Sequence, residues 1–252
     1  MLALSVDQLS VRSHHTLRLD HLSFTVPQGS RLAIIGPNGA GKSTLLQALL
    51  KLIPSTHQSL TCFGQNIDQL SRKALAQLIS YVPQMQPDLA VTVFDWCSYG
   101  RMPHQSLGFS LTDQEQSLIH TMLARTNLTH FANTPFNRLS GGERQRAMIA
   151  ASLCQETPLI LLDEPTNFLD PKQAHDILTL LTEIAHTLDK TIISVTHDVN
   201  EVAHYFTHCL ALKAGHLCFM GAVKDVIHRH NLEKLYDRPF VEAMSEQGVI
   251  FW

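Results

Sequence analysis

The sequence has few of the features that mark nucleic-acid-binding, metal-binding or membrane-spanning proteins. Its formal net charge is −3 and it has no long cluster of Lys and Arg, which argues against nucleic acid as the main partner. Its five cysteines show no metal-site spacing, and scattered cysteines suit a reducing cytosol. It has no signal peptide and no apolar run of membrane-spanning length. We therefore expect a membrane-embedded partner to be a separate polypeptide.

The sequence does contain a complete phosphate-loop pattern, GPNGAGKST, between an apolar run at 32–35 and leucines with helical spacing. Its glycines let the backbone curl so that N–H groups point at phosphates. Lys42 is expected to reach the β- and γ-phosphates and Ser43 to ligate Mg²⁺. The predicted nucleotide-binding residues are Gly36, Pro37, Asn38, Gly39, Ala40, Gly41, Lys42, Ser43 and Thr44.

A pair of carboxylates ends a second apolar run. Leu159 to Leu162 is short enough for a buried parallel strand, and Asp163 and Glu164 follow at its carboxyl end. Ligands of open α/β sheets collect at that end of the strands. We expect Asp163 to hold Mg²⁺ through water and Glu164 to accept a proton from the attacking water.

A second glycine-rich turn, LSGGERQ at 139–145, precedes this strand. A glycine turn that opens a helix offers backbone N–H groups to an anion. The chain is therefore predicted to have two phosphate-binding surfaces. A monomeric phosphate-loop kinase or GTPase would leave the second one unused.

In this order, the motifs resemble those of the ATP-binding subunit of an ABC transporter, over nearly the whole chain. The resemblance implies an α/β fold, with a P-loop NTPase core, an antiparallel β subdomain and a helical subdomain carrying LSGGERQ. Tyr81 to Gln84 resembles the Q-loop, so Gln84 is implied to contact Mg²⁺ and the catalytic water. Asp170 matches the aspartate of the D-loop, which faces the partner subunit. His197 matches the switch histidine, which contacts the γ-phosphate.

The resemblance also implies the partners. Two copies of the chain would meet head to tail around two ATP molecules, so that Ser140, Gly141 and Gly142 of one copy close over the γ-phosphate held by Lys42 of the other. ATP drives this closure because it binds the closed dimer better than the open one. The dimer would lie on the cytoplasmic face of the inner membrane, against permease subunits that work with an external substrate-binding protein.

The cargo is predicted from weaker motifs. The segment 99–104, followed by Asp113, resembles the ATPases of importers for iron chelates, haem and cobalamin. The alternatives are a zinc or manganese importer and, less favoured, a soluble ABC protein of translation or DNA repair. A cleft for a helix of the membrane subunit is expected from Val91, Val93, Phe94 and Trp96, although these residues also fit ordinary core packing. Arg101→Glu near this cleft should uncouple transport and spare hydrolysis.

Two features leave alternatives open. The family usually stacks adenine on an aromatic residue before the phosphate loop, but 11–16 contains none, so Arg12, His14 or His15 is expected to contact the base, or the segment is a solvated loop. Glu201, His204 and His208 have i, i+3 and i+7 spacing, which places them on one helical face as zinc ligands or as ordinary surface residues.

No internal repeat or low-complexity linker divides the 252 residues, so we expect one ABC ATPase domain. The core nucleotide-binding lobe is predicted at 1–83 and 157–230, the helical subdomain at 84–156 and a C-terminal extension at 231–252. The elements expected with most local support are strands at 31–35, 159–163 and 191–196, helices at 112–126 and 142–155, and a short packed helix around 232–236. Thr112 and Glu115 are expected to form a capping box at the start of the first of these helices.

Overall fold

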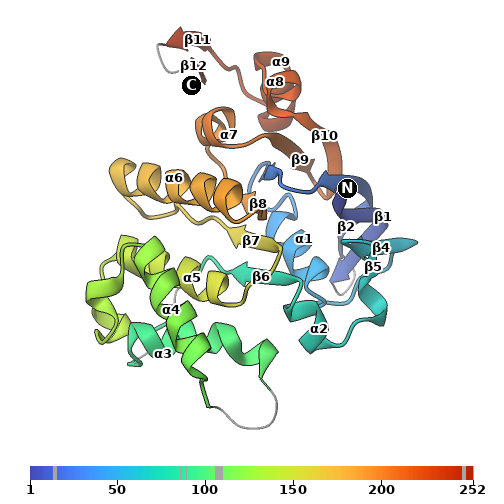
Figure 1. Cartoon of the computed structure of the whole chain (residues 1–252). Coiled ribbons are helices and arrows are strands. Elements are labelled where there is room, and N and C mark those ends of the chain that lie inside the picture. Colours follow the sequence, from blue (N-terminus) through green and yellow to red (C-terminus); the bar gives the residue numbers. More distant parts are fainter. Residues whose placement is uncertain (14–15, 86, 89, 106–109, 246–247, 252) are drawn as a thin grey trace. The chain divides into compact units, whose positions relative to one another are not determined.

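The structure is a computed structural model that describes residues 1–13, 16–85, 87–88, 90–105, 110–245 and 248–251. The chain forms two compact units, whose helices and strands are labelled in Figure 1. Unit 1 contains Met1–Leu70 and Ile184–Trp252, and unit 2 contains Ser71–Glu183. These units are defined by contacts, so the subdomain boundaries expected from the motifs stay a prediction.

Unit 1 contains a four-stranded antiparallel sheet in the order β2-β1-β4-β5. Its strands are β1 (Leu2–Ser13), β2 (Thr16–Pro27), β4 (Ser59–Cys62) and β5 (Gln65–Asn66). The second half of β2 alternates between buried and exposed residues, as a sheet with one solvated face requires. Leu22, Phe24 and Val26 supply its buried face. This sheet is the expected antiparallel β subdomain.

Unit 1 also contains the parallel part of the fold. Strand β3 (Arg31–Ile35) pairs in parallel with both β8 (Thr191–Val195) and β9 (His208–Lys213). Strand β10 (His216–Ala222) returns antiparallel to β9. All five residues of β8 are buried, because a parallel strand is covered on both faces. The expected strands at 31–35 and 191–196 are thus confirmed.

Short helices connect the strands of unit 1. They are α1 (Lys42–Leu49), η1 (Ile67–Gln69), α7 (Val199–Tyr205), α8 (Val223–Val226) and α9 (Arg229–Tyr236), followed by the hairpin β11 (Glu242–Ser245) and β12 (Gly248–Phe251). Leu232 and Leu235 are fully buried. The short packed helix near the C-terminus is therefore confirmed.

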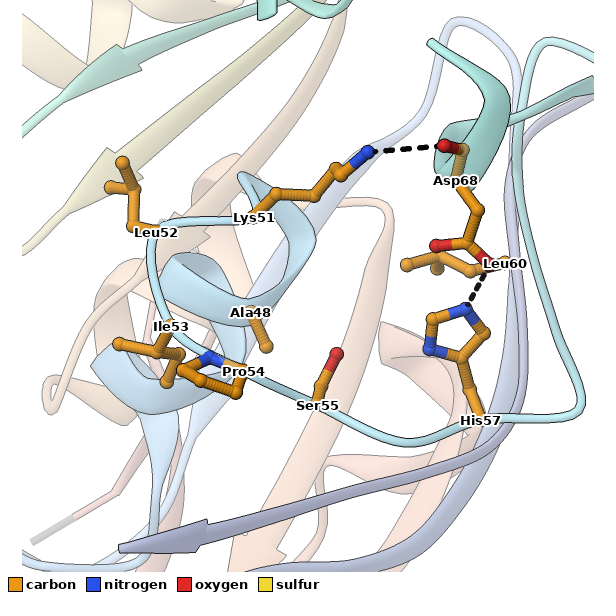
Figure 2. A pocket seen from close by; sticks show the side chains of 9 residues that line it. All are labelled: Ala48, Lys51, Leu52, Ile53, Pro54, Ser55, His57, Leu60 and Asp68. Carbon is orange, nitrogen blue, oxygen red and sulfur yellow. Dashed lines mark hydrogen bonds and ion pairs between the residues drawn. The ribbon is translucent and has the colours of Figure 1, made fainter. Parts of the chain in front are cut away.

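A cavity of about 420 Å³ lies beside the end of α1 in unit 1 (Figure 2). Lys51 Nζ donates to the carbonyl oxygens of Ile67, Asp68 and Leu70, at 3.2, 3.3 and 3.4 Å. On the other side of the cavity, His57 Nε2 lies 2.9 Å from Asp68 Oδ2. These contacts fasten η1, and with it the edge of the antiparallel sheet, to the segment that follows the phosphate-loop helix.

Unit 2 contains the parallel strands β6 (Ile79–Val82) and β7 (Leu159–Asp163) and a group of helices. The helical elements are α2 (Arg72–Ala76), α3 (Val93–Ser98), η2 (Tyr99–His104), α4 (Asp113–Arg125), η3 (Thr129–Phe131), η4 (Phe136–Arg138) and α5 (Gly141–Cys154). Helix α6 (Pro171–Thr187) contains the boundary with unit 1. The capping box expected at Thr112 and Glu115 is present.

Arg101 is buried and held by several contacts in unit 2, a placement that the sequence did not indicate. Its side chain is 8% exposed, and Nη1 donates to Cys154 O at 2.6 Å and to Glu156 Oε2 at 2.7 Å. Its Nε lies 3.5 Å from Glu115 Oε1. The Thr112 N–H first, and also Arg101, lower the pKa of Glu115 below its ordinary value. Arg101 therefore holds the carboxyl end of α5, and Arg101→Glu is expected to destabilise unit 2.

The cleft expected from Val91, Val93, Phe94 and Trp96 stays a prediction. A cavity of about 180 Å³ is lined by Trp96 together with Pro83, Tyr99 and Met148. Val93 is fully buried in the core and does not line this cavity. In the part of the chain that the structure describes, no helix is both long and apolar enough to cross a membrane.

Candidate functional site

The phosphate loop follows β3 and leads into α1 in unit 1. Gly36 has φ 146°, a conformation that side chains rarely adopt. A Cβ atom there would overlap the carbonyl oxygen of Leu212 on β9. The loop thus packs its backbone directly against a neighbouring strand, and only glycine fits at this position.

Lys42 lies inside this loop. The residue is buried, with 6% exposure, and Nζ donates to Gly36 O at 2.7 Å and to Pro37 O at 3.2 Å. No side chain caps the first turn of α1, whose N-cap is Gly41. Helix N-termini of this kind attract anions through their N–H groups and the helix dipole. The cradle and the buried ammonium group fit the phosphates of a nucleotide.

His197 lies at the same edge of the parallel strands as the phosphate loop. Because β8 runs parallel to β3, the two loops leave the carboxyl ends of neighbouring strands. Thr196 N donates to Ile34 O at 3.2 Å, which continues the pairing up to the residue before His197. The His197 side chain is exposed. Unit 1 therefore brings the predicted phosphate-loop residues and His197 to one edge.

In unit 2, strands β6 and β7 bring the predicted carboxylates to one edge in the same way. The strands are parallel, so Gln84 and Glu164 follow their carboxyl ends. Gln84 Nε2 donates to Glu164 Oε2 at 2.6 Å, and Asn167 Nδ2 donates to the same oxygen at 2.9 Å. The structure thus joins two predicted catalytic residues directly. Asn167 is an additional contact that the sequence motif did not identify.

Asp163 is the buried member of the acidic pair, with 4% exposure. Tyr81 Oη donates to its Oδ2 at 3.4 Å. Burial, and after it the charge of Asp163, raise the pKa of Tyr81 to about 12, so the phenol stays a proton donor at neutral pH. Carboxylate and amide oxygens are the ligands that Mg²⁺ takes. Asp163 and the amide of Gln84 therefore have the right chemistry for that ion.

The turn after β7 has an unusual backbone. Glu164 has φ 51° and Phe168 has φ 64°, although neither is glycine, and Phe168 is 92% exposed. Asp170 Oδ1 then accepts a hydrogen bond from Gln173 N at 2.9 Å, and Pro171 begins α6. Asp170 thus caps this helix in the structure. Its predicted contact with a partner subunit stays a prediction.

The LSGGERQ turn begins α5 with a capping box. Ser140 N donates to Glu143 Oε2 at 2.8 Å, and the hydroxyl of Ser140 accepts the N–H of Glu143 in return. Gly141 and Gly142 are the first two residues of the helix. A Cβ atom at Gly142 would lie 3.1 Å from Cδ of the flexible Gln173 side chain. A side chain at Gly142 would therefore require Gln173 to shift.

Two other expectations concern the histidines. His208 is the first residue of β9, and α7 ends at Tyr205, so the expected helical face with Glu201 and His204 does not exist. Within the described ranges, no group of three or more potential ligands could hold a metal ion. The zinc-site expectation is therefore wrong. His14 and His15 lie outside the described residues, and Arg12 is exposed.

Comparison with known proteins gives consistent matches. The profile of the family described as ABC transporter matches residues 19–167. The ferric enterobactin transport ATP-binding protein FepC of Escherichia coli is 36% identical over 86% of this chain and 80% of that protein. The iron(3+)-hydroxamate import ATP-binding protein FhuC of Bacillus subtilis is 35% identical over 94% of this chain and 88% of that protein.

Solved structures match as well. The chain is similar to a protein described as a metal-chelate type ABC transporter in an inward-facing conformation, with TM-score 0.86, 30% identity and coverage of 100% of this chain and 96% of the other. It also shares its fold with MJ1267, an ATP-binding cassette solved in its ADP conformation, with TM-score 0.82, 23% identity and coverage of 90% and 95%. The predicted α/β fold with a P-loop NTPase core is thus confirmed.

Proposed function

Because the chain belongs to the ABC transporter family as an ATP-binding subunit with ATPase activity, we propose that it powers the import of an iron chelate. The observation that carries the cargo assignment is the similarity along most of the chain to FepC and FhuC, whose names give ferric enterobactin and iron(3+)-hydroxamate. Haem and cobalamin are the other cargoes that its importer group handles.

We assign ATP hydrolysis to residues at the carboxyl ends of the parallel strands in unit 1 and in unit 2. Glu164 accepts the proton of the attacking water, a role that typically contributes on the order of 10²–10⁴ in rate. Its hydrogen bonds from Gln84 and Asn167 fix the direction of its carboxylate. Lys42 and His197 stabilise the negative charge of the γ-phosphate. Ser43, Gln84 and Asp163 are assigned to Mg²⁺, which neutralises charge on the phosphate oxygens when bound.

We assign the active form to a homodimer with two shared ATP sites. The uncapped first turn of α1 holds the phosphates of one ATP, and the first turn of α5, with Ser140, Gly141 and Gly142, covers the γ-phosphate from the other copy. Both turns present backbone N–H groups at a helix N-terminus, which favours an anion between them. Asp170 belongs to the same surface.

The remaining partners follow from the family. Permease subunits dock on unit 2, at the cavity lined by Trp96, Tyr99 and Met148, which combines polar and apolar surface. The dimer then lies on the cytoplasmic face of the inner membrane, and an external binding protein delivers the chelate. Copurification of the tagged chain with a membrane subunit, and ferric-chelate uptake that depends on both, test this assignment.

The main test is Glu164→Gln, which removes the base and keeps the shape. The variant should bind ATP like the wild type, lose hydrolysis by about 10²–10⁴ and elute as a dimer with ATP and Mg²⁺ in size-exclusion chromatography. Hydrolysis near the wild-type rate would contradict the role of Glu164. Asp225→Asn, at an exposed carboxylate of α8, is the control for loss of a charge.

Shared sites are tested by mixing two inactive variants. Lys42→Ala loses its own ATP site, whereas Ser140→Arg blocks the site of its partner. Their mixture should regain hydrolysis, because half of its heterodimers' sites combine two intact surfaces. A mixture as inactive as both parents would contradict the shared site.

A further inference from the structure

The C-terminal hairpin is joined to α7 by an unusual pair of hydrogen bonds. Asn200 Nδ2 donates to Phe251 O at 3.0 Å, and Phe251 N donates to Asn200 Oδ1 at 2.8 Å. The side-chain amide thus takes the place of a neighbouring strand for the main chain of Phe251. Phe251 is 3% exposed, so β12 is packed against the rest of unit 1 at this residue.

Hydrogen bonds connect Asn200 with the residues on either side of His197. Asn200 is the second residue of α7, and Asp198 Oδ1 accepts its N–H at 2.8 Å as the helix cap. Thr196 Oγ1 donates to Glu201 Oε2 at 2.7 Å. Both neighbours of His197 in the sequence are therefore bound to the first turn of α7, while His197 itself is exposed.

Helix α7 cannot hold this geometry by itself. It contains seven residues, and isolated helices shorter than about 12 residues are marginal in water. Val199 and Val202 bury one side of it. The Asn200–Phe251 pair adds a directional constraint, since loss of either partner would leave a main-chain group of a buried residue without its hydrogen bond. The position of the His197 turn thus depends on where the hairpin fixes α7.

We propose that Asn200 is a positioning residue for ATP hydrolysis: through the main chain of Phe251 it fixes the first turn of α7, and through that turn it fixes His197. The C-terminal hairpin is then part of the catalytic apparatus. The proposal rests on the role of His197 in the proposed function. The sequence pattern does not show it, because the two residues are 51 positions apart.

The test uses the full-length chain with single substitutions. Asn200→Ala removes both hydrogen bonds and should lower kcat for ATP on the order of ten-fold, with KM within about two-fold, since small misplacements of catalytic groups act on the rate. Asn200→Asp keeps the acceptor for Phe251 N–H and should have an intermediate kcat. The matched control is Lys224→Ala, an exposed residue on the neighbouring short helix α8, which should keep the wild-type kcat.

A double-mutant cycle separates positioning from a general structural effect. If Asn200 acts through His197, Asn200→Ala should have no further effect on kcat in a His197→Ala background. An equal loss in both backgrounds would overturn the proposal, as would a wild-type kcat for Asn200→Ala beside an impaired His197→Ala. If Asn200→Ala does not fold, the same comparison is made with Asn200→Asp. A wild-type rate for His197→Ala would instead contradict the proposed function of that residue.

Discussion

The two glycine turns of this chain both open a helix, but they are held in different ways. The turn before α1 in unit 1 has φ 146° at Gly36 and no side-chain cap, and its backbone packs against the carbonyl of Leu212. The turn before α5 in unit 2 has a full capping box from Ser140 and Glu143. Its two glycines have no positive φ.

The difference shows what each turn can tolerate. Steric packing fixes the first turn at Gly36, so an added Cβ atom there displaces the loop that holds Lys42. Hydrogen bonds of side chains fix the second, and each contributes about 1 kcal/mol. The first turn is therefore a rigid cradle, whereas the second is a capped helix end that accepts small changes. The following substitutions test this contrast.

Gly36→Ala should have the largest effect. The added Cβ would overlap Leu212 O and force a residue with φ 146° out of its conformation, so we expect a loss of more than about 5 kcal/mol in the free energy of unfolding, and no ATP binding. Urea unfolding and a fluorescent-nucleotide titration measure both. Gly39→Ala is the control: it has φ 78° and open space, so it should lose only about 1 kcal/mol. Similar losses for both would contradict the steric account.

Arg101→Glu should have the next largest effect, at the far end of α5. The substitution removes the donor to Cys154 O and puts a carboxylate beside Glu156 and Glu115. We expect a loss of about 3 kcal/mol in the free energy of unfolding. The exposed Arg72→Glu in the same unit should change it by less than about 0.5 kcal/mol. Equal stability of the two variants would show that the buried ion pairs do not hold α5.

Ser140→Ala should lose about 1 kcal/mol, because one N–H in the first turn of α5 loses its acceptor. Ser140→Thr keeps the hydroxyl and should lose less than half of that. Thermal unfolding of both variants without nucleotide measures the cap separately from any role in hydrolysis. A loss as large as that of Gly36→Ala would remove the contrast between the turns.

Gly142→Ala should have the smallest effect on stability, within about 0.5 kcal/mol of the wild type. The gain from replacing a helical glycine is offset by the shift of Gln173 that the new Cβ requires. If α5 covers the ATP of a partner, the same variant should lose hydrolysis although its stability is unchanged. Unchanged hydrolysis would count against that approach.

Elements with local signals were predictable from the sequence. The capping box at Thr112, the apolar strands at 31–35 and 159–163 and the buried leucines of α9 each depend on residues close in the chain. The motifs also predicted which residues follow the strand ends. Gln84 and Glu164 are 80 positions apart, yet parallel pairing of β6 and β7 brings them into contact.

The features that the sequence did not predict have a common physical cause. Arg101 is 53 positions from Cys154, and nothing near it in the chain shows that its guanidinium group turns inward. His208 fitted a helical spacing, but the chain leaves α7 at Tyr205 to form β9. Asn200 and Phe251 meet only after the hairpin has folded back. Tertiary packing decides such contacts, and spacing along a sequence does not encode it.

The left-handed backbone conformation of Glu164 gives stability and the proposed catalytic role opposite requirements at this position. A carboxylate-bearing residue in this conformation costs about 1–2 kcal/mol that glycine would not. A laboratory selection for heat resistance alone would favour glycine at this position. Under the role proposed for Glu164, such variants would bind ATP but not hydrolyse it. Thermostabilised descendants of this chain need a screen for turnover alongside the screen for heat.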